Sequence, residues 1–184
     1  METTILFTYE DYKTLPETGP RYQIIKGDLI MTPAPTTLHQ RISANIEYSL
    51  RQHIWQSGEG EVFDAPVDVI LSDTDVVQPD ILWLQSENRT MVKKEGIFGA
   101  PDLVIEVISP STEAQDRGLK RKLYAKYGVK ELWLVDGHKK EIEIYSIGNR
   151  FEVPNAVVEG NRPLTSLVLP SFKPSLSEFF PPSE

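Results

Sequence analysis

The sequence contains no cysteine, which excludes disulfide bonds and metal sites built on thiolates. No apolar run approaches the ~20 residues that a helix needs to cross a bilayer. The opening residues, METTILFTYEDY, lack the basic start and the apolar stretch of a secretion signal, so we expect a cytoplasmic protein. The formal net charge of -8 argues against a long non-specific coat on nucleic acid, although a local basic groove is compatible with it.

The chain has 184 residues, of which 40% are hydrophobic, and it shows neither a linker nor an internal repeat. This length is enough for one sizeable core. We therefore expect residues 1–184 to form a single domain with its core at about residues 22–147. Residues 167–184 contain four prolines and three phenylalanines and are interpreted as a tail that docks on this domain.

The most informative stretch, residues 101–136, predicts a strand, a helix and a second strand. Residues 102–108 are typical of a buried central strand, except that Glu106 interrupts the apolar run. Residues 113–127 predict the helix and residues 131–136 the second strand, and the short connections imply that the strands are parallel. A carboxylate buried in such a strand needs a lysine, hydrogen-bond donors or a cation as its partner.

Two rows of side chains lie next to each other on the predicted helix. Its apolar positions are Ala114, Leu119, Leu123 and Tyr127, and a neighbouring row at four-residue spacing consists of Asp116, Lys120 and Tyr124. The apolar row is expected to face the core, so Lys120 should lie close enough to reach Glu106. Lys122 stands about 160° round the helix from Lys120 and is expected to face solvent.

The same region is locally basic. Between residues 113 and 130, two acidic side chains accompany six basic ones, namely Arg117, Lys120, Arg121, Lys122, Lys126 and Lys130. Such a cluster either contacts phosphate groups or forms a solvated helix face, and charge alone does not decide between them.

A second carboxylate of interest follows a proline inside the strand predicted at residues 76–84. Pro79 implies an edge, a bulge or a broken ladder, and Asp80 either caps its own backbone there or belongs to a site. Two carboxylates that share a divalent ion must lie within a few ångströms of each other, whereas Asp102 and Glu106 are roughly 13 Å apart along one strand. Asp80 and Glu106 can meet if their strands are neighbours.

The remaining pattern predicts a hairpin, a long helix and further strands. The hairpin covers residues 22–32 around Gly27. The helix begins at Thr36 or Thr37, and its inward stripe consists of His39, Ile42, Ile46, Leu50 and Ile54. A histidine in such a stripe is more often a core group than a ligand. Other strands are predicted at residues 61–64, 66–71, 141–147 and 150–153, the last two as an antiparallel meander.

Several of these motifs, in this order, resemble the Uma-type family of restriction endonucleases, which belongs to the PD-(D/E)xK nuclease superfamily. The resemblance covers about residues 22–145 and rests on Pro79-Asp80, IEVISPST at 105–112, the row Asp116, Lys120 and Tyr124, and GVKELW at 128–133. It implies an α/β fold of the restriction-endonuclease type, with a mixed central β-sheet flanked by helices. The N-terminal hairpin and a C-terminal antiparallel extension would complete this fold.

The resemblance also implies the site residues. Asp80 and Glu106 would bind Mg2+ or Mn2+, and Lys120 would replace the lysine that usually stands two residues after the glutamate. Further candidate site residues are Gln23, His39, Val107 and Lys122. One of them departs from the family, because Gln23 stands where a glutamate is usual, which removes one negative charge from the site.

We therefore expect a Mg2+-dependent endonuclease that hydrolyses DNA phosphodiester bonds with Asp80, Glu106 and Lys120. A homodimer is expected because cutting both strands requires two active sites. The alternative, favoured by Gln23, is a nuclease-like fold that has lost turnover and serves as a nucleic-acid-binding or assembly module. A metal-free acid–base hydrolase ranks last, because no sugar-stacking aromatic pattern accompanies either carboxylate.

Overall fold

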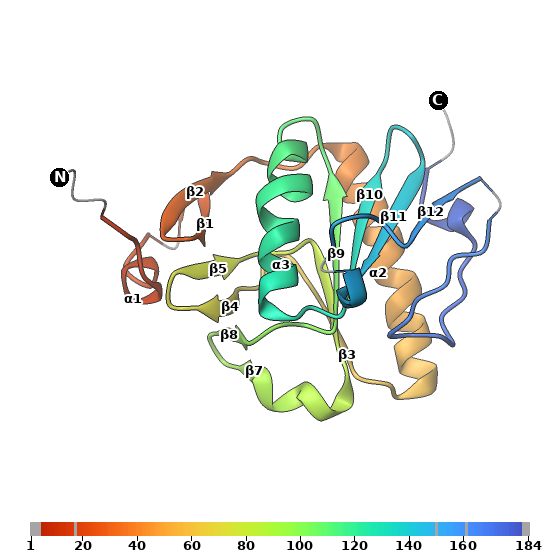
Figure 1. Cartoon of the computed structure of the whole chain (residues 1–184), viewed down its shortest axis with the longest axis horizontal. Coiled ribbons are helices and arrows are strands. Elements are labelled where there is room, and N and C mark those ends of the chain that lie inside the picture. Colours follow the sequence, from red (N-terminus) through yellow and green to blue (C-terminus); the bar gives the residue numbers. More distant parts are fainter. Residues whose placement is uncertain (1–4, 17, 150, 161, 182–184) are drawn as a thin grey trace.

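The computed structural model describes residues 5–16, 18–149, 151–160 and 162–181, in which helices flank two mixed sheets (Figure 1). The first sheet has the order β2-β1-β5-β4-β8-β7 and the second β12-β11-β10-β9-β6-β3. The strands are β1 (Arg21–Ile25), β2 (Asp28–Thr32), β3 (Glu61–Asp64), β4 (Val69–Ser72), β5 (Asp75–Val77), β6 (Ile81–Leu84), β7 (Val92–Lys93), β8 (Gly96–Phe98), β9 (Leu103–Ile108), β10 (Glu131–Asp136), β11 (Glu141–Ser146) and β12 (Ala156–Glu159).

The α-helices are α1 (Tyr9–Tyr12), α2 (Thr37–Ser57) and α3 (Arg121–Tyr127), and a π-helical segment, η2 (Gln115–Lys120), leads directly into α3. Short 3-10 turns are η1 (Ser86–Met91), η3 (Ile147–Asn149) and η4 (Leu176–Glu178). In the part of the chain that the structure describes, none of the helices combines the length and apolar character needed for a membrane span.

The central strand β9 separates two cores because its side chains alternate between the faces of the sheet. It pairs antiparallel with β6 and parallel with β10. Leu103, Ile105 and Val107 pack in the core beneath α2, whereas Val104 and Ile108 belong to the core beneath α3. Glu106 lies between these last two in the alternation, so it faces the same side as α3.

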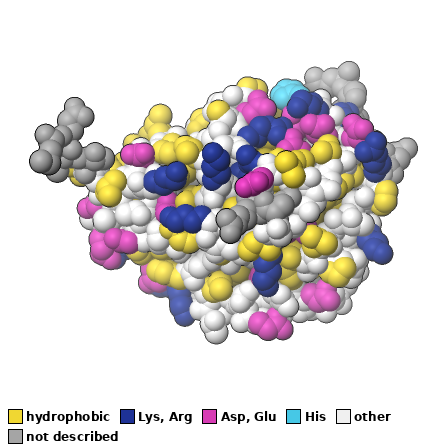
Figure 2. Space-filling view, in the orientation of Figure 1, with side chains coloured by type: hydrophobic (Ala, Val, Ile, Leu, Met, Phe, Trp, Pro, Cys, Tyr) yellow, Lys and Arg dark blue, Asp and Glu magenta, His cyan; other side chains and the backbone are white. Residues whose placement is uncertain are grey.

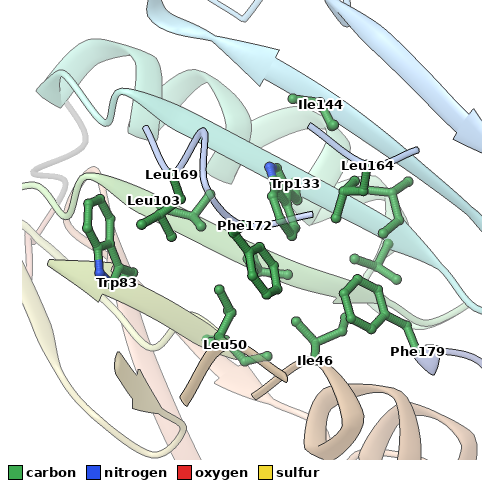
Figure 3. Close-up of a cluster of buried hydrophobic side chains, with 14 of the residues drawn as sticks. Ile46, Leu50, Trp83, Leu103, Trp133, Ile144, Leu164, Leu169, Phe172 and Phe179 are labelled. Atoms are coloured by element: carbon green, nitrogen blue, oxygen red, sulfur yellow. The ribbon is translucent and has the colours of Figure 1, made fainter. Parts of the chain in front are cut away.

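The core beneath α2 is completed by the C-terminal segment. Figure 3 shows Phe172 and Phe179 between α2, represented by Ile46 and Leu50, and Trp133 of β10. The rings of Trp133 and Phe172 are stacked, with their centroids 6.3 Å apart. The Pro- and Phe-containing end of the chain thus covers a sheet face that would otherwise expose large apolar side chains.

The strand, helix and strand predicted around Glu106 are confirmed, including the parallel pairing of β9 with β10. The long helix is also confirmed: Thr36 is its N-cap and accepts a hydrogen bond from the His39 N–H. The strand expected at residues 150–153 is wrong, because residues 151–153 form turns with φ 58° at Phe151, and the partner of β11 is β12 instead. Arg150 lies outside the described residues.

Candidate active site

The two carboxylates singled out in the sequence meet at one end of the β6–β9 pair. Ile81 pairs with Ile105 in this antiparallel ladder, so the next step of the register places Asp80 opposite Glu106. The Val107 N–H donates to Asp80 Oδ2 at 2.7 Å, which fixes the aspartate against β9. Both carboxylates line one pocket, together with Val107 and Lys120. The interruption at Pro79 is what frees Asp80 from regular strand pairing and lets its side chain meet β9.

Glu106 is buried and makes its contacts with side chains of the helix that follows β9. Lys120 Nζ lies 3.1 Å from each of its carboxylate oxygens, and the Tyr124 hydroxyl donates to Oε1 at 2.5 Å. Lys120 Nζ is also 3.3 Å from Asp116 Oδ1, at ion-pair distance but without hydrogen-bond geometry. Two buried carboxylates, Glu106 and Asp116, therefore share one ammonium group.

The helical phase predicted for this segment is partly wrong. Leu119, expected in the core, is 42% exposed, and Ala114 is exposed as well. The side chains of the row Asp116, Lys120 and Tyr124 are buried instead. Because residues 115–120 form a π-helical segment, whose hydrogen bonds reach one residue further than in an α-helix, positions before it rotate relative to those in α3. Lys122 is exposed and does not line the pocket.

The shared ammonium and the burial of the cluster perturb its protonation. Burial raises the pKa of Glu106 to about 8, although Lys120 opposes this shift. Burial likewise raises the pKa of Asp116. Burial alone would lower the pKa of Lys120, but Glu106, Asp116 and Asp80 outweigh it, so the pKa is raised and the ammonium keeps its proton. The carboxylate oxygens of Glu106 and Asp116 can therefore bind either a proton or a cation.

His39, at the start of α2, faces this site, as the family resemblance implied, although a histidine in an apolar stripe is more often a core group. Its Nε2 lies 3.0 Å from Asp80 Oδ2, the oxygen that also accepts from the Val107 N–H. Its side chain is 11% exposed, so the contact is largely shielded from water. Asp80 is thus held from two directions, by the main chain of β9 and by the imidazole from α2.

Gln23, the position that departs from the family pattern, is buried in β1 and already has partners. Its Nε2 donates to Thr32 Oγ1 at 3.0 Å, and its Oε1 accepts from the main-chain N–H of Gln78 at 3.1 Å. Gln78 stands two residues before Asp80, so this amide oxygen stabilises the interrupted strand. Gln23 lines the pocket but is engaged in supporting the segment that carries Asp80.

Buried polar atoms that lack a hydrogen bond are concentrated around the same pocket. Among the described residues, the buried side-chain nitrogen and oxygen atoms without a hydrogen-bond partner are His39 Nδ1, Gln78 Oε1, Gln115 Nε2 and Asp116 Oδ1, and all four residues line it. Buried polar groups normally have partners, so such a concentration indicates a place for water, an ion or a polar ligand.

The donor set fits a hard divalent cation. Asp80 and Glu106 offer carboxylate oxygens, and Mg2+ is commonly bound by one or two carboxylates while it keeps several waters. Within the described ranges no cluster of three or more His, Cys, Asp or Glu side chains has the arrangement of a metal site. The two carboxylates would therefore rely on water or substrate oxygens to complete the ion's shell.

The sequence did not single out Asp116, Gln78 or Gln115 as site residues, yet all three line the pocket. Asp116 had one usable signal, its place in a row with Lys120 and Tyr124. The two glutamines had none, because a glutamine in a strand or a helix is unremarkable in composition and spacing.

The basic cluster around α3 is largely paired. Arg117 contacts Glu113 and Glu143, Lys126 lies 3.3 Å from Asp75, and Lys130 lies 2.7 Å from Asp102. Figure 2 shows Lys and Arg side chains mixed with Asp and Glu on this face. The local excess of positive charge in the sequence therefore serves mainly the fold, and Lys122 remains as an exposed cation.

The fold has known counterparts. A crystal structure from Anabaena variabilis, described as a "putative nuclease belonging to DUF820", has a TM-score of 0.79 at 20% identity, over 95% of this chain and 97% of that one. The molecule thus has a nuclease-like α/β fold. An uncharacterized protein of Synechocystis sp. is 27% identical over 128 residues, which span 68% of this chain and 65% of that protein. The model of the Uma2 family, described as "Putative restriction endonuclease", matches residues 9–177, so the chain belongs to this family.

Proposed function

We propose that the protein is an endonuclease that hydrolyses phosphodiester bonds of DNA with the help of Mg2+ or Mn2+. The observation that carries the proposal is the convergence of Asp80 and Glu106, from neighbouring strands, on a pocket that also holds the Lys120 ammonium. Membership of the Uma2 family and the nuclease-like fold support the same reaction class. Two carboxylates that hold a metal ion and one lysine that stabilises negative charge would be sufficient to hydrolyse a phosphodiester.

The residues divide the work between holding the ion and stabilising charge. Asp80 and Glu106 would hold the ion, and the Val107 N–H and His39 keep Asp80 in place. The ion, when bound, supplies an activated water and offsets negative charge on the scissile phosphate. Lys120 would stabilise the charge that develops on the phosphate, because its acidic neighbours keep it protonated. This favours an electrostatic role for Lys120 over that of a general base.

Cleavage of supercoiled plasmid tests the proposal. The wild-type protein should nick or linearise the plasmid with Mg2+ or Mn2+ and should stop when EDTA is added. Asp80→Asn should remove this activity, because the variant loses a charged metal ligand. Asp73→Asn, an exposed aspartate outside the pocket, is the matched control and should cleave like the wild type. Equal cleavage by Asp80→Asn and the wild type would contradict the assignment.

A second candidate function is a nuclease-like module that binds nucleic acid without cutting it. Gln23 favours it, since the position usual for a third acid holds an amide whose oxygen already accepts from Gln78. Fluorescence anisotropy with labelled duplex DNA in Mg2+ separates the two functions. Tight binding of DNA that stays intact for hours would favour the module, whereas DNA that is cut favours the enzyme.

We also propose a cytoplasmic, single-domain protein that forms a homodimer, because a double-strand cut requires two active sites. Light scattering at micromolar concentration should then give about twice the chain mass of 20.9 kDa. A monomer mass under these conditions would contradict the homodimer.

A further inference from the structure

A second pocket lies next to the active-site pocket, against α1 at the end of the molecule where Figure 1 places the N-terminal hairpin. Its cavity volume of about 460 Å3 falls within the range of about 300–1,000 Å3 that is usual for small-molecule sites. Arg21 and Gln78 line both pockets, so the two are neighbours that share part of their walls. The second space therefore lies within reach of a polymeric ligand that occupies the active site.

The walls of the second pocket are aromatic and apolar. Tyr9, Tyr12, Tyr22, Leu15, Pro16 and Pro20 line it. Tyr9 and Tyr12 stack on each other at 6.5 Å, and Tyr9 also packs edge-on against Phe98 at 5.7 Å. The active-site pocket, in contrast, is lined around its centre by carboxylates, amides and Lys120. The chemistry changes from polar to aromatic across the boundary at Arg21 and Gln78.

Tyr12, one ring of the aromatic wall, is held in place by hydrogen bonds. The Tyr12 hydroxyl donates to Asp68 Oδ1 at 2.8 Å and lies 3.2 Å from the carbonyl oxygen of Tyr22. Gln78 Nε2 donates to the same Asp68 oxygen at 2.9 Å. Because Gln78 precedes Pro79-Asp80, this network connects the aromatic pocket to the segment that carries Asp80. A ring fixed in this way is a preorganised stacking surface, since little side-chain entropy is lost when a ligand binds.

The charged side chains that line the second pocket are two of each sign, and one of the cations, Arg21, stands at the boundary with the active-site pocket. Lys13 and Arg21 are balanced by Asp68 and Glu95. A flat, uncharged group fits such a lining better than a phosphate does. The guanidinium of Arg21 has no ion-pair partner in the described part of the chain, and its residue lines both pockets.

We propose that this pocket binds one unstacked nucleobase of the DNA substrate, turned out beside the phosphate that occupies the active site. The inference rests on the proposed function, because it names a feature of the same substrate. Aromatic rings bind unpaired bases by stacking, with little regard to sequence. Extruding a base costs least where it is mismatched, bulged or already single-stranded. The enzyme should therefore prefer DNA with an unpaired nucleotide over a perfect duplex.

The test compares two labelled duplexes by fluorescence anisotropy in EDTA, so that no cleavage occurs. One duplex carries a single bulged nucleotide, and the other carries a bulged abasic site in the same place. The wild-type protein should bind the bulged base about tenfold more tightly. Equal affinity for the two duplexes would overturn the proposal, and this comparison needs no variant of the protein.

Two variants test whether the preference for an unpaired base comes from this pocket. Tyr9→Ala should bind both duplexes with the weaker affinity, because its stacking wall is lost. Trp55→Ala removes a ring that is 91% exposed near the far end of α2, and it should keep the tenfold difference. A tenfold difference that survives in Tyr9→Ala, or one that disappears in Trp55→Ala as well, would overturn the assignment to this pocket.

Failure of this inference and failure of the proposed function are distinguishable. Binding is measured without metal, so a base preference supports the pocket even in a protein that never cuts. Conversely, metal-dependent cleavage without any base preference would retain the nuclease and exclude the base-binding pocket.

Discussion

The two ends of β9 each bury an acid, and the two acids have different surroundings. Asp102, just before the strand, is 1% exposed; it accepts from the Gln85 N–H and from Asn88 Nδ2, and it pairs with Lys130. Glu106, near the other end, is 2% exposed; Lys120, which it shares with Asp116, and the Tyr124 hydroxyl are its partners. The two acids are thus equally buried, but the hydrogen-bond donors that surround them differ.

The difference shows how a structural acid is distinguished from a functional one. Asp102 is surrounded by donors that the fold itself provides, and it lines none of the pockets described above. Glu131 on β10 is similar: burial raises its pKa too, but it accepts from Trp133 Nε1 and the Leu167 N–H, and it lines neither pocket. Glu106 lines a pocket and has a pKa raised to about 8. A buried acid with too few donors, beside a pocket, is a candidate for binding a cation.

The largest expected effect is on the cleavage rate, and it concerns Lys120, the lysine that contacts Glu106. Lys120→Ala should lower the cleavage rate at saturating DNA by about a hundredfold or more, because a preorganised positive charge is lost at a developing oxyanion. Lys122→Ala is the matched control, since this lysine is exposed and outside the pocket, and it should be nearly silent. Single-turnover cleavage assays measure both. Equal losses, or a loss only in Lys122→Ala, would reverse the assignment.

The next effect is on the free energy of unfolding, which should depend more on Asp102 than on Glu106. Asp102→Ala should destabilise the protein by about 2–3 kcal/mol, because the Gln85 N–H and Asn88 lose their acceptor. Glu106→Gln should cost less than about 1 kcal/mol, because it removes one of two acids that share Lys120. Urea unfolding at pH 7 measures both variants. A Glu106→Gln variant that is the less stable of the two would break the comparison.

The third prediction concerns the pH dependence of stability that Glu106 introduces. Burial raises the pKa of Glu106 to about 8 in the folded protein, from an ordinary value of 4.5. The folded state then binds a proton that the unfolded state has lost, so the stability contributed by this proton is full below pH 4.5. It should fall by up to about 1.4 kcal/mol per pH unit as the pH rises toward 8.

Unfolding free energies of the wild type and Glu106→Gln, measured at intervals from pH 5 to pH 8.5, isolate this contribution. The wild type should lose stability with pH relative to the variant. Parallel curves for the two proteins would mean that Glu106 is ionised throughout, and the contrast with Asp102 would then lose its electrostatic basis.

Much of the fold could be predicted because it depends on local patterns. The continuous apolar run of β9, the capping hydroxyl of Thr36 and the four-residue stripe of α2 are each visible in a short window. The convergence of Asp80 with Glu106 was predictable as well, since Pro79 breaks one strand and Glu106 interrupts another. A single arrangement, two neighbouring strands, accounts for both irregularities.

The rest depends on contacts that no short window contains. The π-helical segment changes which side of the helix is buried, so Leu119 is exposed while Asp116 enters the site. The role of Gln23 was equally hidden, because its partner Gln78 is 55 residues away. The pairing of Lys130 with Asp102 likewise joins segments that the charge pattern treated separately.

The central claim is that the Glu106 end of β9 binds a divalent cation, and calorimetric titration with Mn2+ at pH 7 tests it most directly. The wild type should bind Mn2+ and release about one proton, detectable as a dependence of the heat on the buffer, because Glu106 must ionise to bind. Asp80→Asn should lose this binding, whereas Asp73→Asn should keep it. Undiminished binding by Asp80→Asn, or no binding by the wild type at millimolar Mn2+, would contradict the claim.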